Sequence, residues 1–337
     1  MTTVRLIPVL LLCCWVSATR ADSVSLTIAA EQDGPIATQH EWARKLADSG
    51  IPRARLRSMQ RGEEPGIDQV ESHGATVYMV TGVLDRGGTL HLPGGKFTLR
   101  ELDRLREYLD LVKDEGVAGV TAERGQFNLT KPQFEDAFAR LGRPIDFETK
   151  AMPLFKFLDR LSQRCGLKIE VGHGLEPTMR RLQVRDELRS LSLGCGMAIA
   201  LKAEGMAFSP EKPAAKPMQL KVALTRGLKE KWPIGWPTER RTSELSPIMV
   251  KRINVEIGEG FKLIEVLDNI APRLEMPLLW DHEMLDRRRA DPKQAEVRLP
   301  AASMTYRRIF DRLLFQAGLH GEVRVDEAGT VFYWITD

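Results

Sequence analysis

The sequence has few of the residue patterns that mark enzymatic chemistry. Its six histidines never stand three or four residues apart, which excludes the helical histidine pairs of many zinc sites. No Gly-x-Ser-x-Gly segment is present, which excludes the nucleophile elbow of the α/β-hydrolases. The glycine turns at Pro93–Gly95 and Gly258–Gly260 lack the length or the position of a phosphate-binding loop. We therefore predict no catalytic, cofactor-binding or metal-ligating residue, although a site dispersed over the fold would leave no such pattern.

Long apolar runs are also missing, except at the N-terminus. Arg5 precedes an almost unbroken apolar run, Leu6–Val16, and the mostly small residues Ser17–Ala21 follow it. This order predicts a secretory signal peptide, residues 1–21, that is cleaved after Ala21. The run is about half as long as a membrane-spanning helix. We therefore expect an exported protein of the periplasm or cell envelope with no membrane span in the mature chain, and a retained N-terminal anchor is the alternative.

Cysteine is scarce. Cleavage after Ala21 removes Cys13 and Cys14 and leaves Cys165 and Cys195. An oxidising compartment permits a disulfide between these two residues. Both lie in apolar segments, which favours buried free thiols, and the disulfide is the alternative.

Neither sign of charge dominates. The chain has 49 basic and 46 acidic residues, and loss of Arg5 and Arg20 with the signal peptide lowers the net charge from +3 to about +1. This balance gives no general attraction to nucleic acid or to an anionic membrane, so we expect neither as a partner. A mature chain of about 316 residues that is 43% hydrophobic is long enough for two or three domains.

The first folded region is predicted to span residues 22–126. It begins with the alternating strand Val24–Ile28 and the helical pattern Ala37–Ala47. Strand patterns at Arg53–Arg57 and Ala75–Leu84 follow, and the capping box that begins at Thr98 opens a second helix. This order predicts a small α/β sandwich with a helical layer on one face of a sheet.

Two similar modules follow a helical joint at residues 127–143. We expect the first module at residues 144–225 and the second module at residues 247–337, and a spacer rich in proline and tryptophan at residues 226–246 separates them. The joint contains a capping box, Thr130–Gln133.

An imperfect internal repeat defines the two modules. Ile145–Glu148 matches Ile253–Glu256, and Leu154–Ile169 matches Leu263–Leu278 with one residue inserted. Each copy is expected to contain a strand, an amphipathic helix, a second strand, another helix and a closing strand after a glycine. The glycines that we assign to the closing strands are Gly205 and Gly329. The predicted fold class is therefore α+β: a small N-terminal α/β sandwich followed by two repeated β-α-β…α-β modules.

The second module carries the clearer pattern. Leu263–Ala271 has a Leu-x-x-Val-Leu helix core, Leu278–Trp280 is a short strand, Thr305–Ile309 opens a second helix, and Gly329–Trp334 closes the module. This order resembles the short N-terminal domain of secretins and TonB-dependent receptors. The resemblance implies a periplasmic location and contact with another protein, and it supplies no catalytic residue.

Two surfaces are candidates for partner binding. Arg53, Arg55 and Arg57 alternate along one side of a strand, where they form either an anion-binding face or an ordinary exposed sheet face. In the final strand, alternation separates Phe332 and Trp334 from the face of Val331, Tyr333 and Ile335. We expect either that Phe332 and Trp334 stay exposed for a partner, or that the first region or the spacer residues Trp232 and Trp236 cover them.

Other polar clusters are weaker candidates. His282 and Glu283, which follow Asp281, can hold a cation, but a turn after a strand explains them as well. Cys165 and His173 form the best nucleophile pair, and Cys165 aligns with Leu274, which favours a core position. The sequence favours a non-catalytic protein that contacts another envelope protein. The alternatives are an envelope enzyme with a dispersed site and a periplasmic glycan-binding protein that uses the first region.

Overall fold

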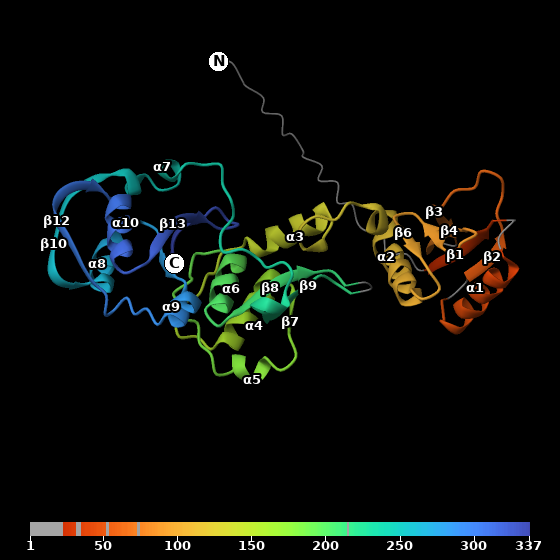
Figure 1. Ribbon diagram of the computed structural model, residues 1–337, viewed down its shortest axis with the longest axis horizontal. Helices are drawn as coiled ribbons and strands as arrows, with labels where there is room; N and C mark the ends of the chain where they lie inside the picture. Colours follow the sequence, from red (N-terminus) through yellow and green to blue (C-terminus); the bar gives the residue numbers. More distant parts are fainter. Residues whose placement is uncertain (1–22, 32–34, 52–53, 73–74, 214–215) are drawn as a thin grey trace, which may run out of the picture. The chain divides into compact units, whose positions relative to one another are not determined.

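The computed structural model describes residues 23–31, 35–51, 54–72, 75–213 and 216–337, so the predicted signal peptide lies outside the described residues. The chain is an α+β protein that divides into two compact units (Figure 1). Unit 1 ends at Glu123 and includes Pro213–Lys216, and unit 2 contains the rest. In the described part of the chain, no helix combines the length and the apolar character that a membrane span requires.

The described residues of unit 1 form six strands and two helices. Their bounds are β1 (Ser23–Ala30), α1 (Ile36–Asp48), β2 (Ala54–Ser58), β3 (Gly66–Ser72), β4 (Ala75–Leu84), β5 (Leu90–Leu92), β6 (Gly95–Phe97) and α2 (Leu102–Thr121). The sheet has the order β2-β1-β4-β5-β6, and β3 also pairs with β4. β1 is parallel to β2 and β4, whereas β3 and β5 are antiparallel to β4.

The two helices of unit 1 share one core with the sheet. Leu26 and Ile28 of β1 are buried in the same cluster as Trp42 of α1 and Leu105 of α2. Because alternate residues of a strand face opposite sides, this places a helical layer against one face of the sheet. Arg55 and Arg57 of β2 alternate with partly buried residues and are exposed.

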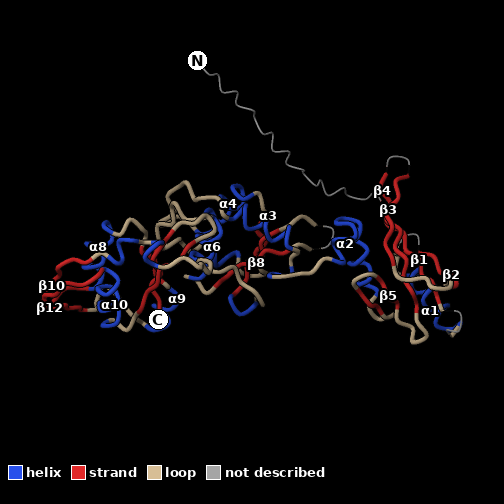
Figure 2. The backbone as a smooth tube through the Cα atoms, turned by 90° about the horizontal axis from the view of Figure 1, so that it is seen from above, coloured by secondary structure: helices blue, strands red, loops and turns tan. Residues whose placement is uncertain are grey.

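Unit 2 contains the joint, both modules and the spacer (Figures 1 and 2). Its first half contains η1 (Gln126–Asn128), α3 (Lys131–Leu141), α4 (Leu154–Cys165), β7 (Lys168–Val171), α5 (Glu176–Met179), α6 (Leu193–Lys202), β8 (Met206–Glu211), β9 (Gln219–Leu224) and η2 (Thr225–Gly227). Its second half contains α7 (Thr242–Leu245), η3 (Pro247–Val250), β10 (Arg252–Lys262), α8 (Leu263–Ile270), η4 (Ala271–Arg273), β11 (Leu278–Trp280), α9 (His282–Arg288), β12 (Glu296–Thr305), α10 (Tyr306–Gln316), β13 (His320–Val325) and β14 (Val331–Thr336).

The two modules contain three-stranded sheets of the same topology. The order is β7-β9-β8 in the first module and β11-β14-β13 in the second. In each sheet the central strand is parallel to the first strand and antiparallel to the last. The second module also contains the antiparallel pair β10-β12, and α8 and α10 lie between this pair and β13 (Figures 1 and 2).

Two predictions about the elements are wrong. Ile145–Glu148 forms no strand, because only Ile145 exchanges backbone hydrogen bonds with residues 190 and 191 before the chain turns at Thr149. The strand after Gly205 is not the closing strand of the first module, since β9 follows it and forms the centre of the sheet. Gly205 and Gly318 are the equivalent glycines, and both have a positive φ after the second helix of their module.

The modules share a core through the last strand. Tyr333 and Ile335 of β14 pack with α8 and α10, whereas Phe332 and Trp334 join the cluster of the first module. Helix α6 belongs to that cluster, and all its residues from Leu193–Leu201 are buried. A helix that is apolar on all sides requires such complete burial, so α6 forms the centre of unit 2.

Candidate functional site

The predicted partner residues Phe332 and Trp334 lie inside the molecule. Their side chains are 0% and 2% exposed, so neither can contact a partner in this structure. Of the two alternatives, exposure to a partner is wrong, because both side chains pack with α6 and with the spacer tryptophans at the contact between the two modules, which we call the seam. The alternation that the sequence predicted for this strand is correct, since Tyr333 and Ile335 occupy the opposite face.

The spacer covers the same seam with its two tryptophans. Trp232 is buried, and its ring stacks on Phe208 of β8 at a centroid distance of 5.7 Å and on Phe127 at 5.5 Å. Trp236 packs edge-to-face on Trp232 at 5.1 Å and pairs its backbone N–H with the carbonyl of Val325. The spacer is thus part of the core of unit 2, and its aromatic rings stabilise the contact between the modules.

The turn between β13 and β14 inserts two carboxylates at the start of α6. Asp326 accepts the backbone N–H of Ser192, the N-cap residue of α6, at 2.6 Å. Glu327 accepts hydrogen bonds from the Ser192 hydroxyl and from the indole of Trp232. A side chain at position 194 would collide with the Glu327 carboxylate, since a Cβ on Gly194 would lie 2.6 Å from it. The N-terminus of a helix favours negative charge, so these contacts of Asp326 and Glu327 with α6 stabilise the packing of the second module on the first.

Burial raises the pKa of Glu327, although hydrogen bonds from Ser192 and Trp232 oppose this shift. The folded protein therefore binds a proton at Glu327 more readily than the unfolded chain does. The resulting stabilisation is complete below the ordinary carboxyl pKa of 4.5 and is lost as the pH rises through the folded value.

We expect the substitution Glu327→Gln to remove this dependence. As the pH rises from about 5 to about 8, the wild type should lose stability relative to the variant. The free energy of unfolding should decrease by about 1.4 kcal/mol for each unit by which the pKa of Glu327 is raised. Urea unfolding at both pH values measures it, and the exposed Glu256→Gln serves as the control. A difference that is constant with pH would contradict the buried, proton-binding state of Glu327.

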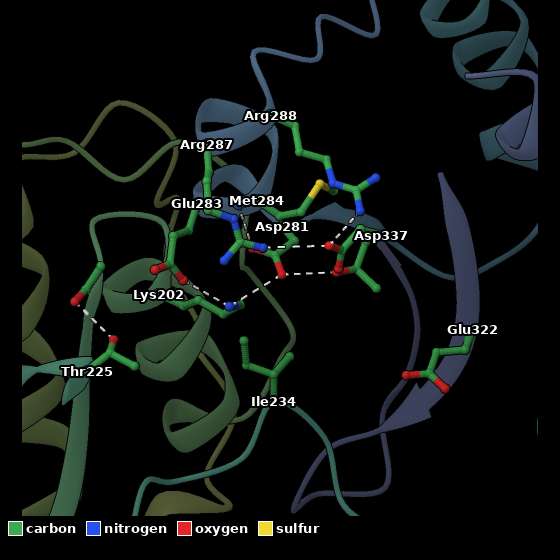
Figure 3. Close-up of polar contacts among 12 residues, drawn as sticks. Lys202, Thr225, Ile234, Asp281, Glu283, Met284, Arg287, Arg288, Glu322 and Asp337 are labelled. Carbon is green, nitrogen blue, oxygen red and sulfur yellow. Dashed lines mark hydrogen bonds and ion pairs between the residues drawn. The ribbon is translucent and has the colours of Figure 1, made fainter. Parts of the chain in front are cut away.

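A lysine ammonium occupies the acidic cluster around His282 and Glu283. Lys202, at the end of α6, lies 3.3 Å from the Asp281 carboxylate and 3.0 Å from that of Glu283 (Figure 3). Asp281 also caps α9 by accepting the N–H of Met284. His282 contacts the carboxylate of Asp186 at 2.9 Å. The sequence missed Lys202, because its partners lie about eighty residues away and follow no local pattern.

Another ion pair joins the modules beside Lys202. Arg185 of the first module donates to Asp286 of the second at 2.7 Å, and it also donates to Glu204 of its own module at 2.9 Å. The seam is therefore apolar at its centre and charged at its edge. Among the residues that the structure describes, no group of three or more His, Cys, Asp or Glu side chains is placed to hold a metal ion.

A cleft opens at this seam, with a volume of about 370 Å³. Phe208, Trp232 and Trp334 border it, but each of them is 3% exposed or less, so their rings offer it almost no surface. Its charged lining consists of Lys202, Lys231, Asp281 and Arg324. In this cleft the lysine and arginine side chains are therefore more accessible than the aromatic rings.

Each module also has a groove beside the first strand of its three-stranded sheet, β7 or β11. In the first module, a groove of about 340 Å³ is lined by Phe155, Ile169 and Met179, from α4, β7 and α5. In the second module, a groove of about 550 Å³ is lined by Ile264, Trp280 and Leu285, from α8, β11 and α9. The two grooves lie at equivalent positions in the topology, so each module offers a surface of the same kind.

The predicted arginine face belongs to unit 1. Arg53 lies outside the described residues, and Arg55 and Arg57 are exposed on β2. Arg57 forms a two-point ion pair with Glu63, and its hydrogen bonds lower the pKa of Glu63 to about 2. This pairing neutralises Arg57, so of the two arginines that the structure describes on this face, Arg55 keeps its charge without a partner in an ion pair.

Cys165 and Cys195 are free in this structure, and both are buried. The alternative of a disulfide between Cys165 and Cys195 is therefore not what the structure contains. Burial raises the pKa of both thiols, whereas a nucleophilic cysteine needs a lowered pKa. His173, the expected partner of Cys165, lies exposed in the turn after β7.

Comparisons of the chain with models of protein families, with curated proteins and with solved structures gave no match.

Proposed function

We propose that the chain is an exported, non-catalytic protein that acts in the cell envelope by binding another envelope protein. The signal-peptide pattern of residues 1–21 supports export. The element order of the modules supports a repeat that resembles the short N-terminal domain of secretins and TonB-dependent receptors. Their identical sheet topology and their paired grooves agree with this interpretation.

The observation that carries the proposal is the open edge of β7. The backbone N–H of Gly172 points to β9, so Ile169 and Val171 direct their N–H and C=O groups to the other side. In the described chain β7 pairs only with β9. Phe155 of α4 is 39% exposed in the adjoining groove. An extended segment of a partner can add to this edge as a strand and place an apolar side chain against Phe155.

We expect the substitution Phe155→Asp to abolish partner binding. A charge in the groove removes the apolar contact at the proposed site, and the loss of recovered partner should be tenfold or more, equivalent to about 1.4 kcal/mol. The measurement is recovery of proteins from an envelope extract on the immobilised full chain. The matched control is Phe315→Asp, because Phe315 is 81% exposed on α10, outside both grooves.

The two alternatives, an envelope enzyme and a glycan-binding protein, predict different results. Turnover of a hydrolase or glycosidase substrate that one point mutation abolishes would establish an envelope enzyme. Retention of the protein on purified cell wall would establish a glycan-binding protein, if substitution of Arg55 in unit 1 abolishes that retention. Equal recovery of the partner by the Phe155→Asp and Phe315→Asp variants would contradict the role of β7.

A further inference from the structure

The open edge of β7 has a charge pattern that is complementary to itself. Lys168 and Glu170 lie on the same face of the strand, one on each side of Ile169. Both charged side chains are exposed, and neither forms an ion pair with another residue that the structure describes. Glu170 accepts one hydrogen bond, from the Gln219 amide of β9 at 2.6 Å. The edge therefore presents one basic and one acidic side chain to any strand that pairs with it.

The backbone of β7 limits how a second copy of this strand can pair with it. Lys168 and Glu170 direct their backbone groups to β9, so within β7 only Ile169 and Val171 offer N–H and C=O groups at the open edge. Three antiparallel registers satisfy this pattern. A register centred on Lys168 places lysine opposite lysine, and one centred on Glu170 places glutamate opposite glutamate. Only the register centred on Ile169 places Lys168 of each copy opposite Glu170 of the other.

We propose that two copies of the chain pair through β7 in this register, antiparallel and related by a two-fold axis at Ile169. The two Ile169 residues then exchange both of their backbone hydrogen bonds. Each Lys168–Glu170 pair occupies a neighbouring position without backbone hydrogen bonds, where opposite side chains approach most closely. The three-stranded sheets of the two first modules become one sheet in the order β8-β9-β7-β7-β9-β8. This closed arrangement covers an edge that would otherwise favour unspecific association.

The inference rests on the open β7 edge that carries the proposed function. A second copy and an envelope partner use the same backbone groups, so the two contacts exclude each other. Their side-chain contacts differ, because α4 with Phe155 packs on the face of Ile169 and Val171. Lys168 and Glu170 lie on the opposite face. Substitution of the charged pair therefore separates the dimer from the partner contact at Phe155.

Sedimentation equilibrium of the purified full chain measures the dimer. We expect a monomer–dimer equilibrium with a Kd below about 100 µM. Lys168→Glu places glutamate opposite glutamate at both charge pairs, so the Kd should rise about tenfold or more. The double variant Lys168→Glu with Glu170→Lys exchanges the two charges and restores both pairs, so its Kd should lie within about threefold of the wild type. Its recovery also shows that neither substitution unfolds the chain.

Lys229→Glu is the matched control, because it reverses the charge of an exposed lysine outside β7 and should leave the Kd unchanged. The inference is overturned if the chain stays monomeric at about 200 µM, if Lys168→Glu dimerises as well as the control, or if the double variant stays as weak as Lys168→Glu. Failure of the proposed function gives a different result: Phe155→Asp and Phe315→Asp recover the partner equally, while the dimer keeps its dependence on Lys168 and Glu170.

Discussion

Replacing Phe332 with alanine is expected to lower the free energy of unfolding of unit 2 by about 3–5 kcal/mol. The ring is fully buried where β14 of the second module enters the core of the first module. Removal leaves a cavity that the surrounding strands and α6 cannot fill without moving, because protein interiors are close-packed. The effect combines the loss of apolar burial with the cost of that cavity.

Urea-induced unfolding of the full chain measures this change. Phe315→Ala is the matched control, since Phe315 is 81% exposed and its loss should change the stability by less than about 0.5 kcal/mol. A decrease below about 1 kcal/mol for Phe332→Ala would mean that the two modules do not share a core. The same experiment therefore tests whether the contact between the modules is part of the fold.

The sequence predicts which residues of β14 share a face, but it does not predict which parts of the chain cover each face. Strict alternation of apolar residues determined which side chains share a face, and the structure confirms this division between Phe332 and Tyr333. It could not determine what covers each face, because the covering residues come from α6 and the spacer, about one hundred residues earlier. The same limit applies to α6, whose weak amphipathic pattern is a consequence of burial on all sides.

The polar contacts of the seam could not be predicted from local sequence patterns for the same reason. Asp281 looked like a turn residue or a cation ligand, and it caps α9 while it binds Lys202. Glu327 lies in the turn between β13 and β14, where Gly329 has a positive φ, and its partners Ser192 and Trp232 are far apart in the chain. Turn chemistry is local and therefore readable, whereas the pairing of charges depends on the tertiary fold.

The substitution Asp326→Ala should cost about 2–4 kcal/mol, the second-largest effect that we expect. The Asp326 side chain is 4% exposed, and its carboxylate accepts three backbone N–H groups. These come from Ala328 at 2.9 Å, from Thr330 at 2.7 Å and, across the seam, from Ser192 at 2.6 Å. Alanine leaves all three donors without a partner and removes negative charge from the start of α6.

A graded series of variants separates the charge of Asp326 from its shape. Asp326→Asn keeps an oxygen for the turn but directs an NH₂ group at the Ser192 N–H, so its cost should lie between those of wild type and alanine. Asp291→Ala is the control, because Asp291 is exposed and accepts one local N–H, from Lys293, and its loss should cost less than about 1 kcal/mol. If Asp326→Ala were no more costly than Asp291→Ala, the turn would not hold the modules together. The contact of the second module with α6 would then depend on the apolar seam around Phe332 alone.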